Sequence, residues 1–150
     1  MSLELIIELV SAAIGTLAFS VLYAVPKQHF PACALIGAAG WLTYRAALAV
    51  HVSVAFAVFF ATLVIVLLSR IMAVRRQCPA TVFMITGIFP LVPGAQIYWA
   101  AYYLVTNQFA EASDSGFTAL KVMIAIVLGI VFVFEVPNKV FLMLKSKKDA

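Results

Sequence analysis

Five long apolar stretches, separated by short polar joints, dominate the chain and limit what it can fold into. A helix needs roughly 20 residues to cross a hydrocarbon layer about 30 Å thick, and each stretch has about that length. The stretches and their joints use nearly all of the 150 residues, which leaves no length for a separate soluble domain. We therefore predict an all-α, polytopic membrane protein with one transmembrane domain and five spans, at about 3–25, 32–50, 52–69, 79–105 and 117–136.

The composition agrees with this interpretation, because 65% of the residues are hydrophobic and 11% are charged. A soluble domain is typically about half apolar and about a quarter charged, so a water-soluble core does not explain the sequence. The boundary between the second and third spans is the tightest, since only Arg45, His51 and a few hydroxyl groups interrupt the apolar run between Ala32 and Ser69. A re-entrant segment there remains an alternative to two full spans.

The basic residues are distributed unevenly between the two ends of the expected spans, and this predicts an orientation. Five spans place the termini on opposite faces, and eight of the ten Lys and Arg residues fall on the face of the C-terminus, against Arg45 and Lys121 on the other. Because cytoplasmic joints carry the excess of Lys and Arg, we expect the N-terminus outside and the C-terminus in the cytoplasm. The eight residues are Lys27, Arg70, Arg75, Arg76, Lys139, Lys145, Lys147 and Lys148.

Residues that often mark other functions form no recognisable pattern here. The net charge of +4 is spread over short joints, so contact with anionic lipid explains it better than nucleic acid does. Cys33 and Cys78 have no partners at metal-ligand spacing and are expected to be free thiols, and His29 and His51 are interpreted as interfacial residues. Since no enzyme signature is present, we expect no enzymatic activity, no metal and no cofactor.

The fourth span carries the most informative motif, a segment from Pro90 to Gly94 that contains two prolines and a glycine at its centre. Each proline lacks a backbone donor, and its ring crowds the carbonyl four residues earlier, here those of Thr86 and Phe89. Gly94 then allows backbone angles that other residues avoid. A helix broken at the centre of a membrane is tolerated only where protein or a wet cavity surrounds it, and such breaks commonly form substrate sites in transporters.

The half-helix that starts after Gly94 is expected to direct the amides of Ala95, Gln96 and Ile97 towards the membrane centre. A helix start favours an anion, so a solute with a carboxylate is the natural ligand. Pro93, Gly94, Gln96 and Tyr98 are therefore candidate substrate-binding residues, with Tyr98 also suited to an interfacial aromatic belt. The alternative is a plain proline kink that neighbouring helices stabilise.

Two further groups of residues have a structural and a functional interpretation. Gly37 and Gly40 form a small-residue surface that suits close helix packing or lines a path. Arg45, accompanied by Trp41 and Tyr44, is either an interfacial anchor or a substrate-binding residue. Glu4 and Glu8 share one helical face and are interpreted as a solvated outer end.

Three segments of the chain resemble the threonine/serine exporter family, specifically its small subunit, which is similar to the C-terminal membrane half of the fused exporters. The segments are VPKQHFPACALIGAAGW (25–41), RRQCPATVF (75–83) and PLVPGAQIYWAAY (90–102). The resemblance implies proton-driven export of small amino acids such as threonine and serine across the bacterial cytoplasmic (inner) membrane, and split relatives are linked to dicarboxylate export. Pro90, Pro93, Gly94 and Tyr98 occupy the family's central segment, and Gly37, Gly40 and Trp41 its earlier glycine motif.

The fused members have an additional N-terminal half, so the resemblance implies a separate, larger membrane subunit as partner. A five-span half with its N-terminus outside is the inverse of one with its N-terminus inside, and such halves form inverted repeats around a substrate site. We expect a ten-span unit of two unlike chains, with further oligomerisation left open. The alternative is an accessory or scaffold subunit that stabilises a partner holding the whole site.

Overall fold

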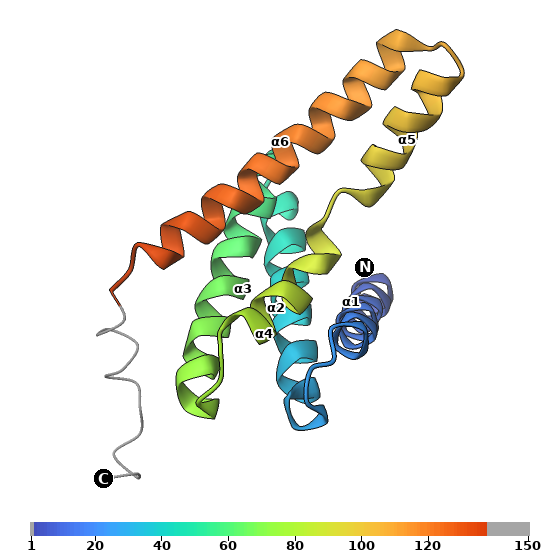
Figure 1. Ribbon diagram of the computed structural model, residues 1–150. Helices are drawn as coiled ribbons and strands as arrows, with labels where there is room; N and C mark the ends of the chain where they lie inside the picture. Colours follow the sequence, from blue (N-terminus) through green and yellow to red (C-terminus); the bar gives the residue numbers. More distant parts are fainter. Residues whose placement is uncertain (1, 138–150) are drawn as a thin grey trace, which may run out of the picture.

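The computed structural model describes residues 2–137, and these form helices joined by short turns, with no strand among them (Figure 1). The all-α prediction is confirmed. Lys139, Lys145, Lys147 and Lys148, which contribute to the predicted orientation, lie outside the described residues. In chain order the elements are α1 (Ser2–Leu22), η1 (Lys27–His29), α2 (Phe30–Ala49), α3 (Val54–Arg76), α4 (Thr81–Ile88), η2 (Phe89–Leu91), α5 (Gly94–Val105) and α6 (Phe109–Phe134).

Four helices in the described part of the chain are long and apolar enough to cross a membrane. A fifth span results if the bent pair Thr81–Leu91 and Gly94–Val105 is counted as one, with a bend of 52° between its halves. This agrees with the five spans expected, and two of the helices are longer than the predicted spans. Helix α3 continues past residue 69 to Arg76, and α6 begins at Phe109 instead of 117. Charged residues extend both helices beyond their apolar parts, because basic side chains suit a helix C-terminus and acidic ones an N-terminus.

Helices α2 and α3 form a hairpin around a very short turn. His51 adopts a left-handed conformation with φ of 59°, and the amides of Val50 and Val52 each donate to the carbonyl oxygen of Ala47 at 3.3 Å. The two helices then pack side by side. Since each is long enough to span, the structure has two full helices where a re-entrant segment was the alternative.

Helix α2 lies at the centre of the bundle and packs against α1, α3 and α4. Its glycines permit these contacts: a Cβ at Gly37 would overlap the Thr16 side chain of α1, and a Cβ at Gly40 would overlap Ile65 of α3. Both partners are fully buried. Any larger side chain at either glycine would therefore separate α2 from its neighbour.

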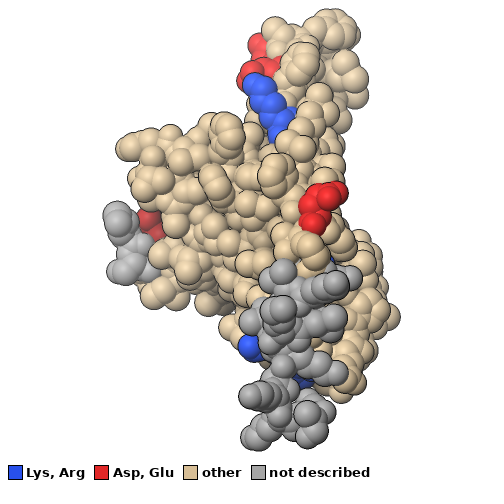
Figure 2. Space-filling view, turned by 90° about the vertical axis from the view of Figure 1, so that its left-hand side faces the viewer, with Lys and Arg blue, Asp and Glu red and all other residues tan. Residues whose placement is uncertain are grey.

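Helix α5 and the first half of α6 form a hairpin that projects from the bundle (Figure 1). No residue of α5 is buried, and its aromatic side chains are largely exposed. Figure 2 shows one face of the molecule on which charged residues form only small groups, with a broad surface of other residues between them. Exposed apolar area on this scale indicates a surface that a bilayer or another membrane helix covers.

Candidate functional site

The helix of the fourth span is interrupted at Val92 and Pro93. Val92 has an extended conformation with ψ of 129°, and Pro93 has ψ of 54°, whereas Phe89 before Pro90 stays helical. A proline disfavours the helical conformation of the residue before it, so Pro93 acts on Val92 and causes the break. Pro90 lies near the C-terminal end of the continuous helical segment Thr81–Leu91, where the chain stays helical through Phe89.

Most backbone groups at this interruption have partners. The amide of Val92 donates to the Phe89 carbonyl oxygen at 3.1 Å, that of Gly94 to Val92 at 2.8 Å, and that of Ile97 to Pro93 at 3.1 Å. The amides of Ala95 and Gln96 belong to the first turn of α5 and have no acceptor within the helix. They form the electropositive start of a new helix, as the sequence predicts.

A hollow of about 250 Å³ lies at the interruption, between α2, α3, η2, α5 and α6. We call it the break hollow. It brings together four candidate residues, Trp41, Pro90, Pro93 and Gln96. Tyr44, which the sequence analysis noted only as a neighbour of Arg45, adds a hydroxyl group to the wall. The full lining is Trp41, Tyr44, Val54, Val58, Pro90, Leu91, Val92, Pro93, Ala95, Gln96 and Val122.

Other candidate residues lie outside the break hollow. Gly37 and Gly40 are at helix contacts, and Tyr98 is 62% exposed and stacks against Tyr102 on the surface of α5. Gly94 does not use the conformational freedom expected of it, since no described glycine has a positive φ and a Cβ at Gly94 would meet nothing within 4 Å. The expectation for Gly94 was wrong because Pro93 alone accounts for the interruption.

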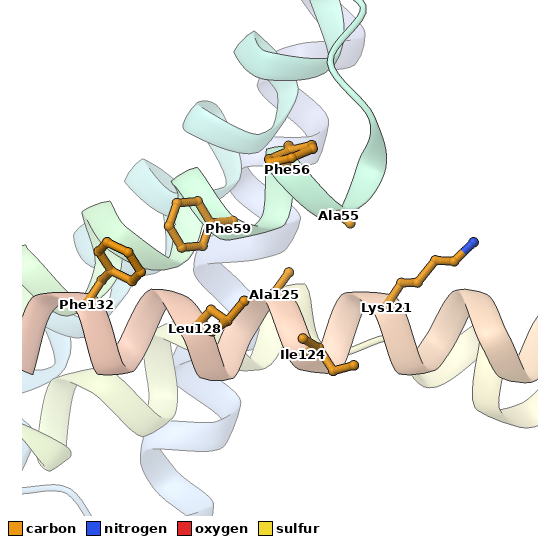
Figure 3. A pocket seen from close by; sticks show the side chains of 8 residues that line it. All are labelled: Ala55, Phe56, Phe59, Lys121, Ile124, Ala125, Leu128 and Phe132. Carbon is orange, nitrogen blue, oxygen red and sulfur yellow. The ribbon is translucent and has the colours of Figure 1, made fainter.

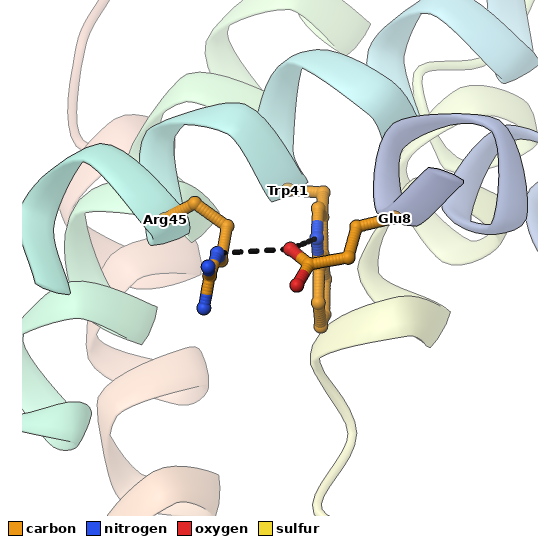
Figure 4. Close-up of polar contacts among 3 residues, drawn as sticks. All are labelled: Glu8, Trp41 and Arg45. Carbon is orange, nitrogen blue, oxygen red and sulfur yellow. Dashed lines mark hydrogen bonds and ion pairs between the residues drawn. The ribbon is translucent and has the colours of Figure 1, made fainter. Parts of the chain in front are cut away.

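A polar cluster connects α1 and α2 beside the break hollow (Figure 4). Arg45 Nε lies 2.8 Å from Glu8 Oε2, and Trp41 Nε1 donates to the same oxygen at 3.2 Å. The side chains of Arg45 and Glu8 are 42% and 32% exposed. Glu8 is therefore partnered, and the expected solvated end was wrong for this residue.

The sequence holds a signal for this placement of Glu8. Glu8, Ala12, Thr16 and Ser20 recur at spacing of four, and the last three are buried on the face of α1 that meets α2. Small and polar side chains at that period indicate a helix contact, which places Glu8 towards α2. Trp41 belongs both to this cluster and to the lining of the break hollow, so it joins the two.

Arg70 has a structural role that sequence reasoning missed. It lies inside α3 and not in a joint, it is 7% exposed, and its Nη1 donates to the carbonyl oxygens of Val133 and, at 2.8 Å, Val136. Its guanidinium also lies 5.4 Å from the ring centroid of Phe134. A cation at the C-terminal end of α6 complements the helix dipole, so Arg70 fastens α6 to α3.

Apart from the break hollow, a groove of about 360 Å³ runs between α3 and α6 (Figure 3). Apart from Lys121, whose ammonium group points away from the aromatic rings, its wall consists of apolar side chains. A carboxylate would find few polar partners there, so the groove suits a lipid chain or another helix better than a polar solute. The lining residues are Ala55, Phe56, Phe59, Lys121, Ile124, Ala125, Leu128 and Phe132.

Within residues 2–137, no three His, Cys, Asp or Glu side chains are placed to hold a metal ion. Cys33 is buried and Cys78 half-buried, and both are free thiols. The polar features that the site offers are thus an open helix start, an amide, a hydroxyl and an adjacent ion pair. They can bind an anionic or zwitterionic solute.

Comparison with known proteins agrees with this arrangement. The family model described as "Threonine/Serine exporter, ThrE" matches residues 8–136. An uncharacterized protein of Haemophilus influenzae is 29% identical over 143 residues, which cover 93% of this chain and 48% of that protein. The chain thus spans about half the length of this relative, and no solved structure matches it significantly. Because the family model covers most of the chain, the protein belongs to the threonine/serine exporter family, a family of membrane transporters.

Proposed function

We propose that the chain is a subunit of a membrane exporter of threonine, serine or related carboxylate-bearing metabolites such as dicarboxylates, and that the break hollow holds the solute. The observation that carries this proposal is the start of α5 at the wall of a hollow between the bundle and the α5–α6 hairpin. Interrupted membrane helices with this geometry bind substrate carboxylates in transporters. The hollow's 250 Å³ lies below the range of about 300–1,000 Å³ typical of drug-sized ligands, which suits a small amino acid.

Different groups around the break hollow would bind different parts of an amino acid. The free amides of Ala95 and Gln96 and the dipole of α5 favour the carboxylate. The Gln96 side chain and the Tyr44 hydroxyl provide hydrogen-bonding groups for the rest of the solute. The carbonyl of Pro93 is occupied by the Ile97 amide, so the hollow presents mainly donors at the helix start.

The Glu8–Arg45 pair offers a way to couple binding to proton movement. Arg45 has Glu8 as its counter-ion, and a solute carboxylate carries the same charge and can compete for the guanidinium. Binding of the solute next to Trp41 would then release Glu8 from Arg45. Proton-driven export, which the family resemblance implies, would draw on this exchange of carboxylates.

The transporter acts with a second, larger membrane subunit in this proposal. The support is that the chain aligns with about half of a longer relative, and that α5 leaves its apolar face uncovered. The two chains form inverted repeats in the bacterial inner membrane, with this chain's N-terminus outside and its C-terminus in the cytoplasm. A scaffold subunit that holds a partner's complete site is the second candidate, favoured by the many exposed apolar residues.

Replacement of Pro93 by Ala separates these two functions. It restores the missing donor and lets Val92 become helical, so the open helix start is lost. We expect export to fall by more than about tenfold, equivalent to about 1.4 kcal/mol, while the complex still assembles. Gly94→Ala, where a Cβ meets open space, is the matched control and should retain export. Full export by Pro93→Ala would favour the scaffold function.

A further inference from the structure

A second polar hollow, of about 420 Å³, lies at the end of the bundle where α2 begins and α3 ends. We call it the basic hollow. Its wall combines residues at the start of one candidate span, Lys27–Ala49, with the last residues of another, Val54–Arg76. Span ends lie at the level of the lipid headgroups. The lining residues are Gln28, His29, Arg75, Arg76 and Gln77.

His29 carries a buried donor without a partner in this wall. The residue is 5% exposed, its ring meets Phe83 edge-on at 5.5 Å between centroids, and Nδ1 has no hydrogen-bond partner among residues 2–137. Gln28 Nε2 lies 3.3 Å from His29 Nε2. Because an amide nitrogen only donates, Nε2 of the ring accepts in this contact, which leaves Nδ1 as the donor of the ring. Buried polar groups are nearly always paired, so the Nδ1 donor indicates an acceptor that binds there.

The charge of the basic hollow identifies the kind of acceptor. Arg75 and Arg76 each present planar guanidinium donors, and none of the described residues that line this wall is acidic. Arginine forks match the oxygens of phosphate and carboxylate groups. The excess of basic residues on cytoplasmic joints explains why arginines lie at this end of the membrane. It explains neither the hollow nor the buried imidazole donor.

We propose that the basic hollow binds the phosphate group of an anionic phospholipid. Arg75 and Arg76 hold the phosphate oxygens, His29 Nδ1 donates to the same group, and the acyl chains extend along the apolar surface of the bundle. The lipid is the source of the phosphate because the hollow opens where two spans end, at headgroup depth. Bound there, it ties the α1–α2 joint to the end of α3.

Thermal unfolding of the purified full chain in a neutral detergent tests this site, with dioleoyl phosphatidylglycerol or dioleoyl phosphatidylcholine added in matched amounts. We expect phosphatidylglycerol to raise the unfolding temperature more than phosphatidylcholine does, and Arg75→Gln and Arg76→Gln each to reduce that difference. His29→Phe keeps the ring contact and removes the donor, so it should reduce the difference too. Lys27→Gln removes one charge at the same end without lining the hollow and should keep it.

An equal loss in Lys27→Gln and in the arginine variants would overturn the proposal, because it would mean unspecific attraction to surface charge. Equal stabilisation by the two lipids would also overturn it. A third arm adds inorganic phosphate without lipid, and stabilisation that matches that of phosphatidylglycerol would assign the site to a free anion instead. No effect of inorganic phosphate, together with the lipid effect, supports a headgroup site.

Discussion

The charge of Arg45 is stabilised on a membrane helix by Glu8, which reaches it across the α1–α2 contact. This pair could not be predicted from the sequence as a pair, because the spacing on α1 marks a contact face but does not say that α2 is the helix that meets it. The spacing of Glu8, Ala12 and Thr16 indicates the face only once a neighbouring helix is assumed. Arg45 itself stood out as a charge within a span, for which a functional interpretation is the default.

Variants of Glu8 and Arg45 distinguish an ion pair that only stabilises the fold from one that also binds the solute. Arg45→Gln should lower export about tenfold or more, because a charged hydrogen bond contributes about 1.5–3 kcal/mol. Its effect on stability should stay within about 1 kcal/mol, since both side chains are partly exposed. The double variant Glu8→Arg with Arg45→Glu restores the pair and should restore the unfolding temperature but not export. Recovery of export in the double variant would show that the pair has a structural role alone.

Cys78 provides a pH-dependent measurement at the joint between α3 and α4. Burial raises the pKa of its thiol, the nearby Cys33 raises it further, and Arg76 lowers it. Only the thiolate reacts with maleimide, so a raised pKa means slower labelling at neutral pH than for an unfolded cysteine, with a rate that rises as pH increases. Arg76→Gln removes the opposing charge and should slow labelling at a given pH. Faster labelling in that variant would contradict the assignment.

The sequence shows which residues interrupt a helix or allow close packing, but it does not show which neighbouring helix each of them contacts. The proline-glycine segment predicted an interruption, but either Pro90 or Pro93 could have caused it. The surroundings of the residue before each proline differ. Phe89 stacks on Phe19 of α1 with ring centroids 3.3 Å apart, and its backbone stays helical before Pro90. Val92 is exposed, and Pro93 converts it to an extended conformation.

Close approach of α1 and α2 can be tested with a pair of glycines. Gly37→Ala places a methyl group against Thr16, and overpacking of this kind typically costs about 1–3 kcal/mol of unfolding free energy. Gly15→Ala adds the same group on α1 where a Cβ meets nothing within 4 Å, so it should be neutral or stabilising by up to about 1 kcal/mol. Thermal unfolding of both variants in detergent makes the comparison. Equal stability would exclude the tight α1–α2 contact.

On the scale of the whole molecule, the chain has a packed bundle and a projecting α5–α6 hairpin (Figure 1). The number of spans was predictable because apolar length alone decides whether a helix can cross a bilayer. The shape was not, since within residues 2–137 the element that packs extensively against α5 is α6, which leaves much of α5 exposed. The break hollow joins the two parts, because α5 begins at its wall.

Protection of a cysteine in the break hollow by solute tests the central claim most directly. Cys33 and Cys78 are first replaced by Ala, and Ala95→Cys, inside the hollow, is compared with Gln108→Cys, in the exposed joint before α6. Both variants are labelled with a water-soluble maleimide in membranes that contain the whole exporter. We expect threonine to slow labelling of Ala95→Cys and to leave Gln108→Cys unchanged, because the solute occupies the start of α5. Equal labelling of Ala95→Cys with and without saturating threonine or serine would contradict the account.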